Sequence, residues 1–183
     1  MKHLILSFSL IAGILFSATA QEKSSKYKVS LGPEFLYPLG STAEFYSSGY
    51  GASLQGQYKL SPKLSATLTA GYNSVATSKL YKAIFTPWGG NVSNTIVYPA
   101  KAGLKYIFHK NFYVVADAGA AISPKPLVRE TSFAYSGGVG TSFEISSKSS
   151  IDVGIRYEEW ALSTSNRYSF AVIRAAYVFG FGY

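Results

Sequence analysis

The ionisable side chains of this sequence recur on alternate positions, beside glycine, serine and threonine. Alternation is the period of a β-strand, in which successive side chains point to opposite faces. If these faces are enclosed, opposite charges there should pair, because an unpaired buried charge is costly. We predict that they form a polar network, with six bases and five acids: Lys28, Glu34, Lys59, Lys101, Lys105, Asp117, Glu144, Asp152, Arg156, Glu158 and Arg174.

Catalytic and metal-binding chemistry has few candidates. Beyond the N-terminal segment the chain has one histidine, His109, in an "HKN" turn, and there is no cysteine. A serine nucleophile needs a base nearby, and none accompanies the serines. Glu158 and Glu159 could hold Ca²⁺ at a rim, although adjacent acids are more often a solvated strand end. No glycine-rich phosphate motif occurs. We therefore predict no catalytic residue, no metal and no cofactor, in a protein that is not an enzyme.

Eight segments of the chain show period-two alternation, which predicts strands. The segment 64–72 is the clearest, with Leu64, Ala66 and Leu68 on the face opposite to Ser65 and Thr67. In the last segment Phe170 and Val172 have the opposite parity to Ile173, and a bulge near Val172 would reconcile them. The expected strands cover about 27–37, 50–60, 64–72, 95–108, 112–122, 132–146, 150–159 and 166–183.

The connections between these segments alternate in length. Three are tight turns, "SPK", "HKN" and "SSK", and the others cover about 38–49, 73–94, 123–131 and 159–165. Short turns at one end and long loops at the other are typical of outer-membrane barrels. An even number of strands puts both chain ends on the short-turn, periplasmic side.

A soluble barrel, such as a lipocalin, would show the same alternation. Two features favour a membrane barrel. The opposite faces are rich in glycine, serine and threonine, which suit a narrow lumen, rather than in the lysine and glutamate of a solvated exterior. Aromatic residues also recur near strand ends, as in interface girdles. We predict an all-β fold: an eight-stranded antiparallel up-and-down transmembrane β-barrel. Its girdle residues are Tyr37, Tyr58, Tyr72, Tyr98, Tyr106, Phe112, Tyr135, Phe143, Tyr157 and Tyr177.

The N-terminus has the pattern of a secretory signal peptide. Lys2 and His3 precede an apolar run, Leu4 to Phe16, and Ala18-Thr19-Ala20 fits the small-x-small cleavage rule. We predict cleavage between Ala20 and Gln21, so that 1–20 is the signal peptide and 21–183 the barrel domain.

The last strand carries a row of aromatic residues at Tyr177, Phe179, Phe181 and Tyr183. This row resembles the C-terminal assembly signal of bacterial outer-membrane proteins, although phenylalanine is the commoner last residue. Over residues 27–183 the chain resembles the small outer-membrane β-barrel domain family of the OmpX and OmpA-barrel type, especially versions from Bacteroidota. The resemblance implies an outer-membrane location and recognition by the barrel-assembly machinery.

The chain has a formal net charge of +8 and a pI of about 9.5, so an anionic binding partner is expected. The bases are spread along the chain and export argues against nucleic acid. Outer-membrane lipid and lipopolysaccharide are the expected partners, because bases in or beside the long loops could attract phosphates. Those bases are Lys79, Lys82, Lys125, Arg129 and Arg167.

The long segment 73–94 contains an apolar patch that is a candidate for contact with an extracellular ligand. A cap over the mouth or a contact with lipid headgroups remains open as well. The patch consists of Leu80, Tyr81, Ile84, Phe85 and Trp88. We predict a filled lumen and a structural or surface-interaction role through the long loops. The alternative is a narrow channel for ions or small solutes.

Overall fold

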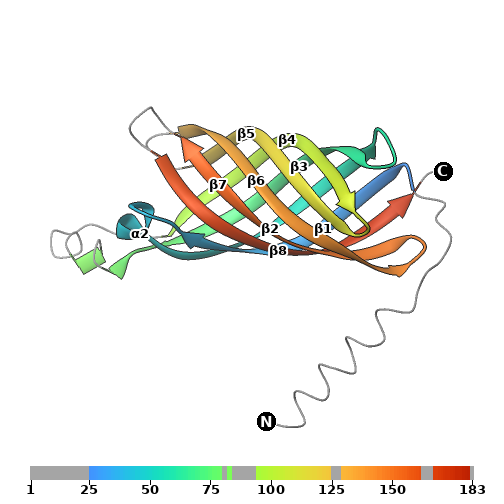
Figure 1. Cartoon of the computed structure of the whole chain (residues 1–183). Helices are drawn as coiled ribbons and strands as arrows, with labels where there is room; N and C mark the ends of the chain where they lie inside the picture. The colour runs from blue at the N-terminus through green and yellow to red at the C-terminus, as the bar shows by residue number, and fades with distance from the viewer. Residues whose placement is uncertain (1–24, 80–81, 84–93, 125–128, 162–166, 182–183) are drawn as a thin grey trace, which may run out of the picture.

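The computed structural model describes residues 25–79, 82–83, 94–124, 129–161 and 167–181. Eight strands form one closed barrel in which each strand pairs with its chain neighbours and β1 pairs antiparallel with β8 (Figure 1). The predicted eight-stranded up-and-down barrel is therefore confirmed. The strands are β1 (Tyr27–Pro38), β2 (Tyr46–Lys59), β3 (Leu64–Thr77), β4 (Thr95–His109), β5 (Phe112–Pro124), β6 (Arg129–Ser146), β7 (Ser149–Ala161) and β8 (Arg167–Phe181).

Several strands extend further toward the long connections than the sequence pattern indicates. Residues 46–49 and 73–77 were expected in loops, but they belong to β2 and β3. The first long connection also contains one turn of helix, α2 (Thr42–Phe45). Among the described residues there is no helix with the length and apolar character needed to cross a membrane.

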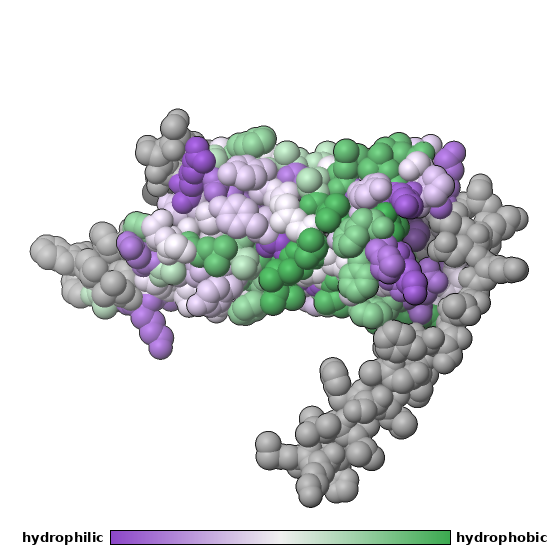
Figure 2. All heavy atoms as spheres, viewed as in Figure 1, coloured by the Kyte–Doolittle hydropathy of each residue, from purple (hydrophilic) through white to green (hydrophobic). Residues whose placement is uncertain are grey.

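The two faces of each strand differ sharply in exposure. On β3, Leu68 is 69% exposed on the outer wall, whereas its neighbour Thr69 is 5% exposed in the interior. Outer rings pack against one another near the strand ends, as Tyr27 does against Tyr58 and Phe181. Figure 2 shows a hydrophobic band across the wall, with hydrophilic residues toward both ends. An apolar band between aromatic girdles is the surface that a barrel presents to lipid.

β8 is regular, so the bulge predicted near Val172 is wrong. Its pairing with β7 runs without a register shift from Ser149↔Phe179 to Ala161↔Arg167. Phe170 and Val172 are fully buried on the same inner face as Arg174. The mixed pattern therefore has another cause: apolar side chains occupy part of the interior.

Candidate functional site

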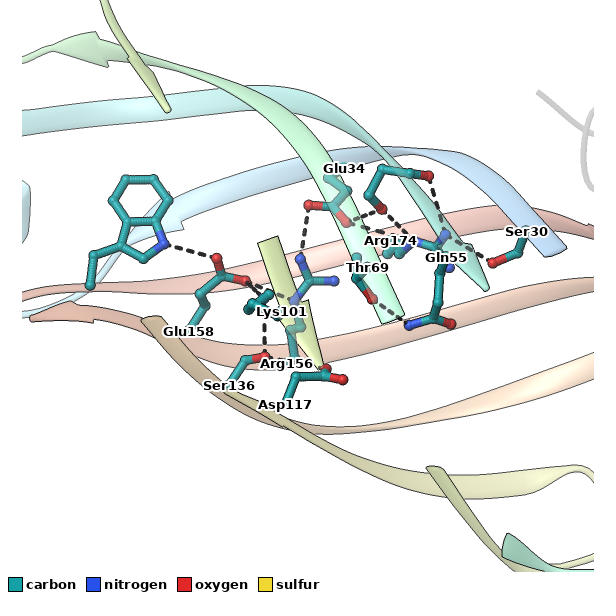
Figure 3. Close-up of polar contacts among 12 residues, drawn as sticks. Ser30, Glu34, Gln55, Thr69, Lys101, Asp117, Ser136, Arg156, Glu158 and Arg174 are labelled. Atoms are coloured by element: carbon teal, nitrogen blue, oxygen red, sulfur yellow. Dashed lines mark hydrogen bonds and ion pairs between the residues drawn. The ribbon is translucent and has the colours of Figure 1, made fainter. Parts of the chain in front are cut away.

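Glu158 on β7 is the centre of a buried ionic network inside the barrel (Figure 3). Its carboxylate is fully buried and accepts hydrogen bonds from Lys101 Nζ at 2.6 Å and Arg156 Nε at 2.9 Å. The indole Nε1 of Trp160 donates a third hydrogen bond, at 2.8 Å. These contacts satisfy a charge that would otherwise be costly to bury.

Glu34 on β1 extends this network around the barrel wall from β7 to β1 and β2. It accepts a hydrogen bond from Arg156 Nη2 at 2.8 Å and one from Ser53 Oγ at 2.5 Å. Arg174 Nε lies 3.6 Å from Glu34 and donates to Ser53 Oγ at 2.8 Å. The ion pairs therefore connect β1, β7 and β8, which come from the two ends of the chain.

A second set of contacts lies nearer to the short turns. Lys105 pairs with Asp152 at 2.5 Å, and its Nζ also lies 3.8 Å from the centroid of the Tyr113 ring. The Tyr113 ring lies against Gly140, where an added Cβ would be 2.4 Å from the ring. Gly140 is paired with Tyr113 on the neighbouring strand, so its missing side chain leaves the space for the ring over the inner face of β6.

The charges of the inner network cancel. Asp117 completes the set, accepting a hydrogen bond from Thr67 Oγ1 at 2.9 Å. A cavity of about 40 Å³ beside these groups has room for a few water molecules. We call the residues linked to Glu158 and the separate Lys105–Asp152 pair together the inner network. It contains four acids and four bases: Glu34, Asp117, Asp152, Glu158, Lys101, Lys105, Arg156 and Arg174.

The remaining three predicted network residues lie nearer to the short-turn end of the barrel. Lys28 and Lys59 are half-buried there. Glu144 differs from the prediction, because its side chain is exposed. Its strand has a register shift between Glu144 and Ser146, beside the β6–β7 turn, and residues 143–148 there are all exposed.

A buried apolar cluster fills the interior on the long-loop side of the charges, and the sequence analysis missed it. The rings of Trp160 and Phe170 are 4.6 Å apart within it, and Tyr46 and Tyr168 pack against it. We call this cluster the apolar plug. Its members are Leu36, Val75, Val97, Ala121, Ala134, Trp160, Phe170 and Val172.

The residues of the apolar plug could have been found from the alternation of inner and outer positions along each strand. Leu36 lies two residues after Glu34, Trp160 two after Glu158, and Val172 two before Arg174. Each therefore continues the inner face of its strand, since side chains alternate between faces. The predicted polar face simply becomes apolar toward the long connections.

The connection between β1 and β2 is held to β8 and to the end of β3 by hydrogen bonds. Leu39 N donates to Ser169 O at 2.9 Å, and Ser169 N donates to Thr42 Oγ1 at 2.9 Å. On the other side Ser78 N donates to Phe45 O at 2.9 Å. α2 and its flanks thus join β8 to the end of β3 above the plug.

The acids and the histidine that the sequence offered for metal binding or catalysis lie apart in the described part of the chain. Glu158 points inward, whereas Glu159 accepts hydrogen bonds from the outer-wall residues Tyr135 and Tyr157, so the two acids do not share a cation site. His109 is exposed at the end of β4. The described part of the chain has no group of three or more His, Cys, Asp or Glu residues that could hold a metal.

Three of the four predicted assembly-signal residues lie in β8, where Tyr177, Phe179 and Phe181 are exposed on the outer wall. The other predicted sites fall outside the described residues: Tyr183, the loop patch Leu80, Tyr81, Ile84, Phe85 and Trp88, and the cleavage site Ala20 and Gln21.

Solved structures with the same fold include three small bacterial proteins. Ail, the attachment invasion locus protein of Yersinia pestis, is 15% identical, with a TM-score of 0.51 over 87% of this chain and 100% of that one. Neisserial surface protein A is 14% identical, with a TM-score of 0.59 over 86% and 98%. OprG from Pseudomonas aeruginosa is 12% identical, with a TM-score of 0.58 over 88% and 98%.

The search of the curated proteins found no match. The family model described as the outer membrane protein beta-barrel domain matches residues 8–183, which is nearly the whole chain. Together with the closed barrel and its apolar wall, this match shows that the chain belongs to the outer membrane protein beta-barrel domain family and is a bacterial outer-membrane protein.

Proposed function

We propose that this barrel is a closed platform in the outer membrane and that it acts through its outer end, in envelope structure or surface interaction. The observation that carries the proposal is the filled interior. The apolar plug and the ionic network occupy successive levels of the lumen. An eight-stranded barrel is only wide enough for side chains to fill.

The two levels oppose passage for different reasons. The plug is lined by buried aliphatic and aromatic side chains, which offer a hydrated ion no hydrogen bonds. Below it, an ion would have to break contacts such as those of Glu158 with Lys101 and Arg156. Breaking a buried ion pair is strongly unfavourable.

Lipopolysaccharide is the partner that we propose for the outer end. Lys79 is exposed just beyond β3, and the exposed Arg167 lies 3.4 Å from Glu159 at the start of β8. Both bases could meet lipid phosphates through charge attraction. Of the other predicted contacts, Lys82 is half-buried, and Lys125 and the Arg129 side chain lie outside the described part.

A narrow channel is the second candidate, because the cavity lined by Lys105, Asp117 and Arg156 gives the lumen some room for water. The plug argues against it. Permeation therefore separates the two functions.

The test is swelling of vesicles that contain the purified barrel, in isotonic arabinose or glycine. We expect the swelling rate to equal that of vesicles without protein, while a general porin in parallel vesicles gives rapid swelling. Swelling by the wild type that decreases as the solute becomes larger would contradict the proposal and support the channel.

A further inference from the structure

The short turns at the periplasmic end each carry one exposed lysine. Lys63 lies between β2 and β3, Lys110 between β4 and β5, and Lys148 between β6 and β7. Lys26 is exposed just before β1. Because the barrel closes in chain order, these four lysines recur once every two strands around its circumference. We call them the lysine ring.

The lysine ring lies at the more basic end of the described molecule. With Lys28 and Lys59, the periplasmic end has six lysines and one acid, Glu144, an excess of five positive charges. The described residues of the outer end have four bases and three acids, an excess of one: Lys79, Lys82, Arg129, Arg167, Glu44, Glu130 and Glu159. The charges of the inner network cancel, so the asymmetry lies between the ends.

The ring lies beside the aromatic girdle. Lys26 Nζ is 5.5 Å from the centroid of the Tyr58 ring, which also packs against Tyr27. Next to Lys110, the outer rings of Phe108 and Phe112 are 6.4 Å apart. Aromatic girdles mark the boundary between hydrocarbon and headgroups. The lysines just beyond them are therefore at the depth of the headgroup phosphates.

We propose that the lysine ring binds the phosphate headgroups of anionic phospholipids in the periplasmic leaflet. Lipids surround a barrel on every side, and the lysines are distributed in the same way. A periplasmic polymer or protein would approach from below or from one side and would need a continuous patch rather than separated turns. The proposal is independent of what the outer end binds.

The experiment measures lipid preference by electron spin resonance, with spin-labelled phosphatidylglycerol and phosphatidylcholine in phosphatidylcholine vesicles containing the purified barrel. The variant carries Lys63→Gln, Lys110→Gln and Lys148→Gln, and the matched control carries the outer-end changes Lys79→Gln and Lys82→Gln. Heat-modifiable migration on a gel verifies that each protein is folded.

We expect the wild type to prefer phosphatidylglycerol, by about fivefold at each lysine site. The control should keep most of this preference, because Lys79 and Lys82 lie at the less basic end of the described molecule. The turn variant should lose most of this preference, and salt should weaken it in the wild type. The proposal would be overturned if the wild type showed no preference for phosphatidylglycerol. It would also be overturned if the turn variant retained the preference of the wild type. A third result would also overturn it: a turn variant that no longer co-sediments with peptidoglycan but has the lipid preference of the wild type. The polymer, rather than the lipid, would then be the partner.

Discussion

Replacing Glu158 with alanine is expected to lower the free energy of unfolding by about 3–5 kcal/mol, the range for breaking a buried ion pair. The change leaves Lys101 and Arg156 without the carboxylate that both now contact, and the indole N–H of Trp160 loses its acceptor. Glu158 is fully buried and Lys101 is 2% exposed, so bulk water cannot replace the lost carboxylate for both bases. Urea unfolding in detergent micelles, followed by tryptophan fluorescence, gives the free energy.

Two further variants separate the charge from the packing of Glu158. Glu158→Gln retains the size and an oxygen acceptor, so it should lose less stability than Glu158→Ala. Adding Lys101→Met to Glu158→Ala should restore part of the loss, because one unpaired buried charge is removed. A loss below about 1 kcal/mol for Glu158→Ala, the level of a surface pair, would contradict the network as described.

Replacing Phe170 with alanine is expected to cost about 3–5 kcal/mol, as large-to-small changes in packed cores do. Its ring is fully buried and lies 4.6 Å from the Trp160 ring and 6.2 Å from the Tyr46 ring. The variant leaves a cavity inside the barrel that neighbouring strands cannot close, since their pairing fixes the diameter. The same urea titration measures the loss.

Phe179→Ala is the matched control for this variant. Phe179 lies on the same strand but is 48% exposed on the outer wall. Detergent can occupy the space that its ring leaves, so no cavity forms and the loss should be less than half of that for Phe170→Ala. Equal losses would show that the inner and outer faces of β8 are not distinguished as the structure has them.

Much of the fold could be predicted because one physical constraint acts on every strand. A strand with lipid on one side and a narrow lumen on the other must alternate, as Leu68 and Thr69 do. Tight turns such as the one at Lys110 then fix the order and direction of the strands. The ionic residues followed the same rule: six of the predicted set are linked through Glu158, Glu34 and Ser136, and Lys105 and Asp152 form a separate inner pair.

The apolar plug was missed because alternation disappears where both faces are apolar. Phe170 and Val172 line the lumen, while Ile173 lies on the outer wall, and this mixture resembles a bulge. Glu144 shows a second limit of the sequence pattern. Its position in the alternation correctly assigns it to the inner face of its strand, but alternation does not tell how close to the end of the barrel a residue lies, and Glu144 is exposed there. The partners of each charge depend on cross-barrel geometry. Arg156 meets Glu34 across 122 residues of sequence, which no local pattern reveals.

The closed lumen is tested most directly by single-channel recording of the wild-type barrel in a planar lipid bilayer in concentrated KCl. The apolar plug and the paired charges predict a flat baseline with no discrete current steps, even at high voltage. Reproducible steps of uniform size, altered by Glu158→Gln or enlarged by Phe170→Ala, would show an ion path through the interior and would contradict the closed barrel.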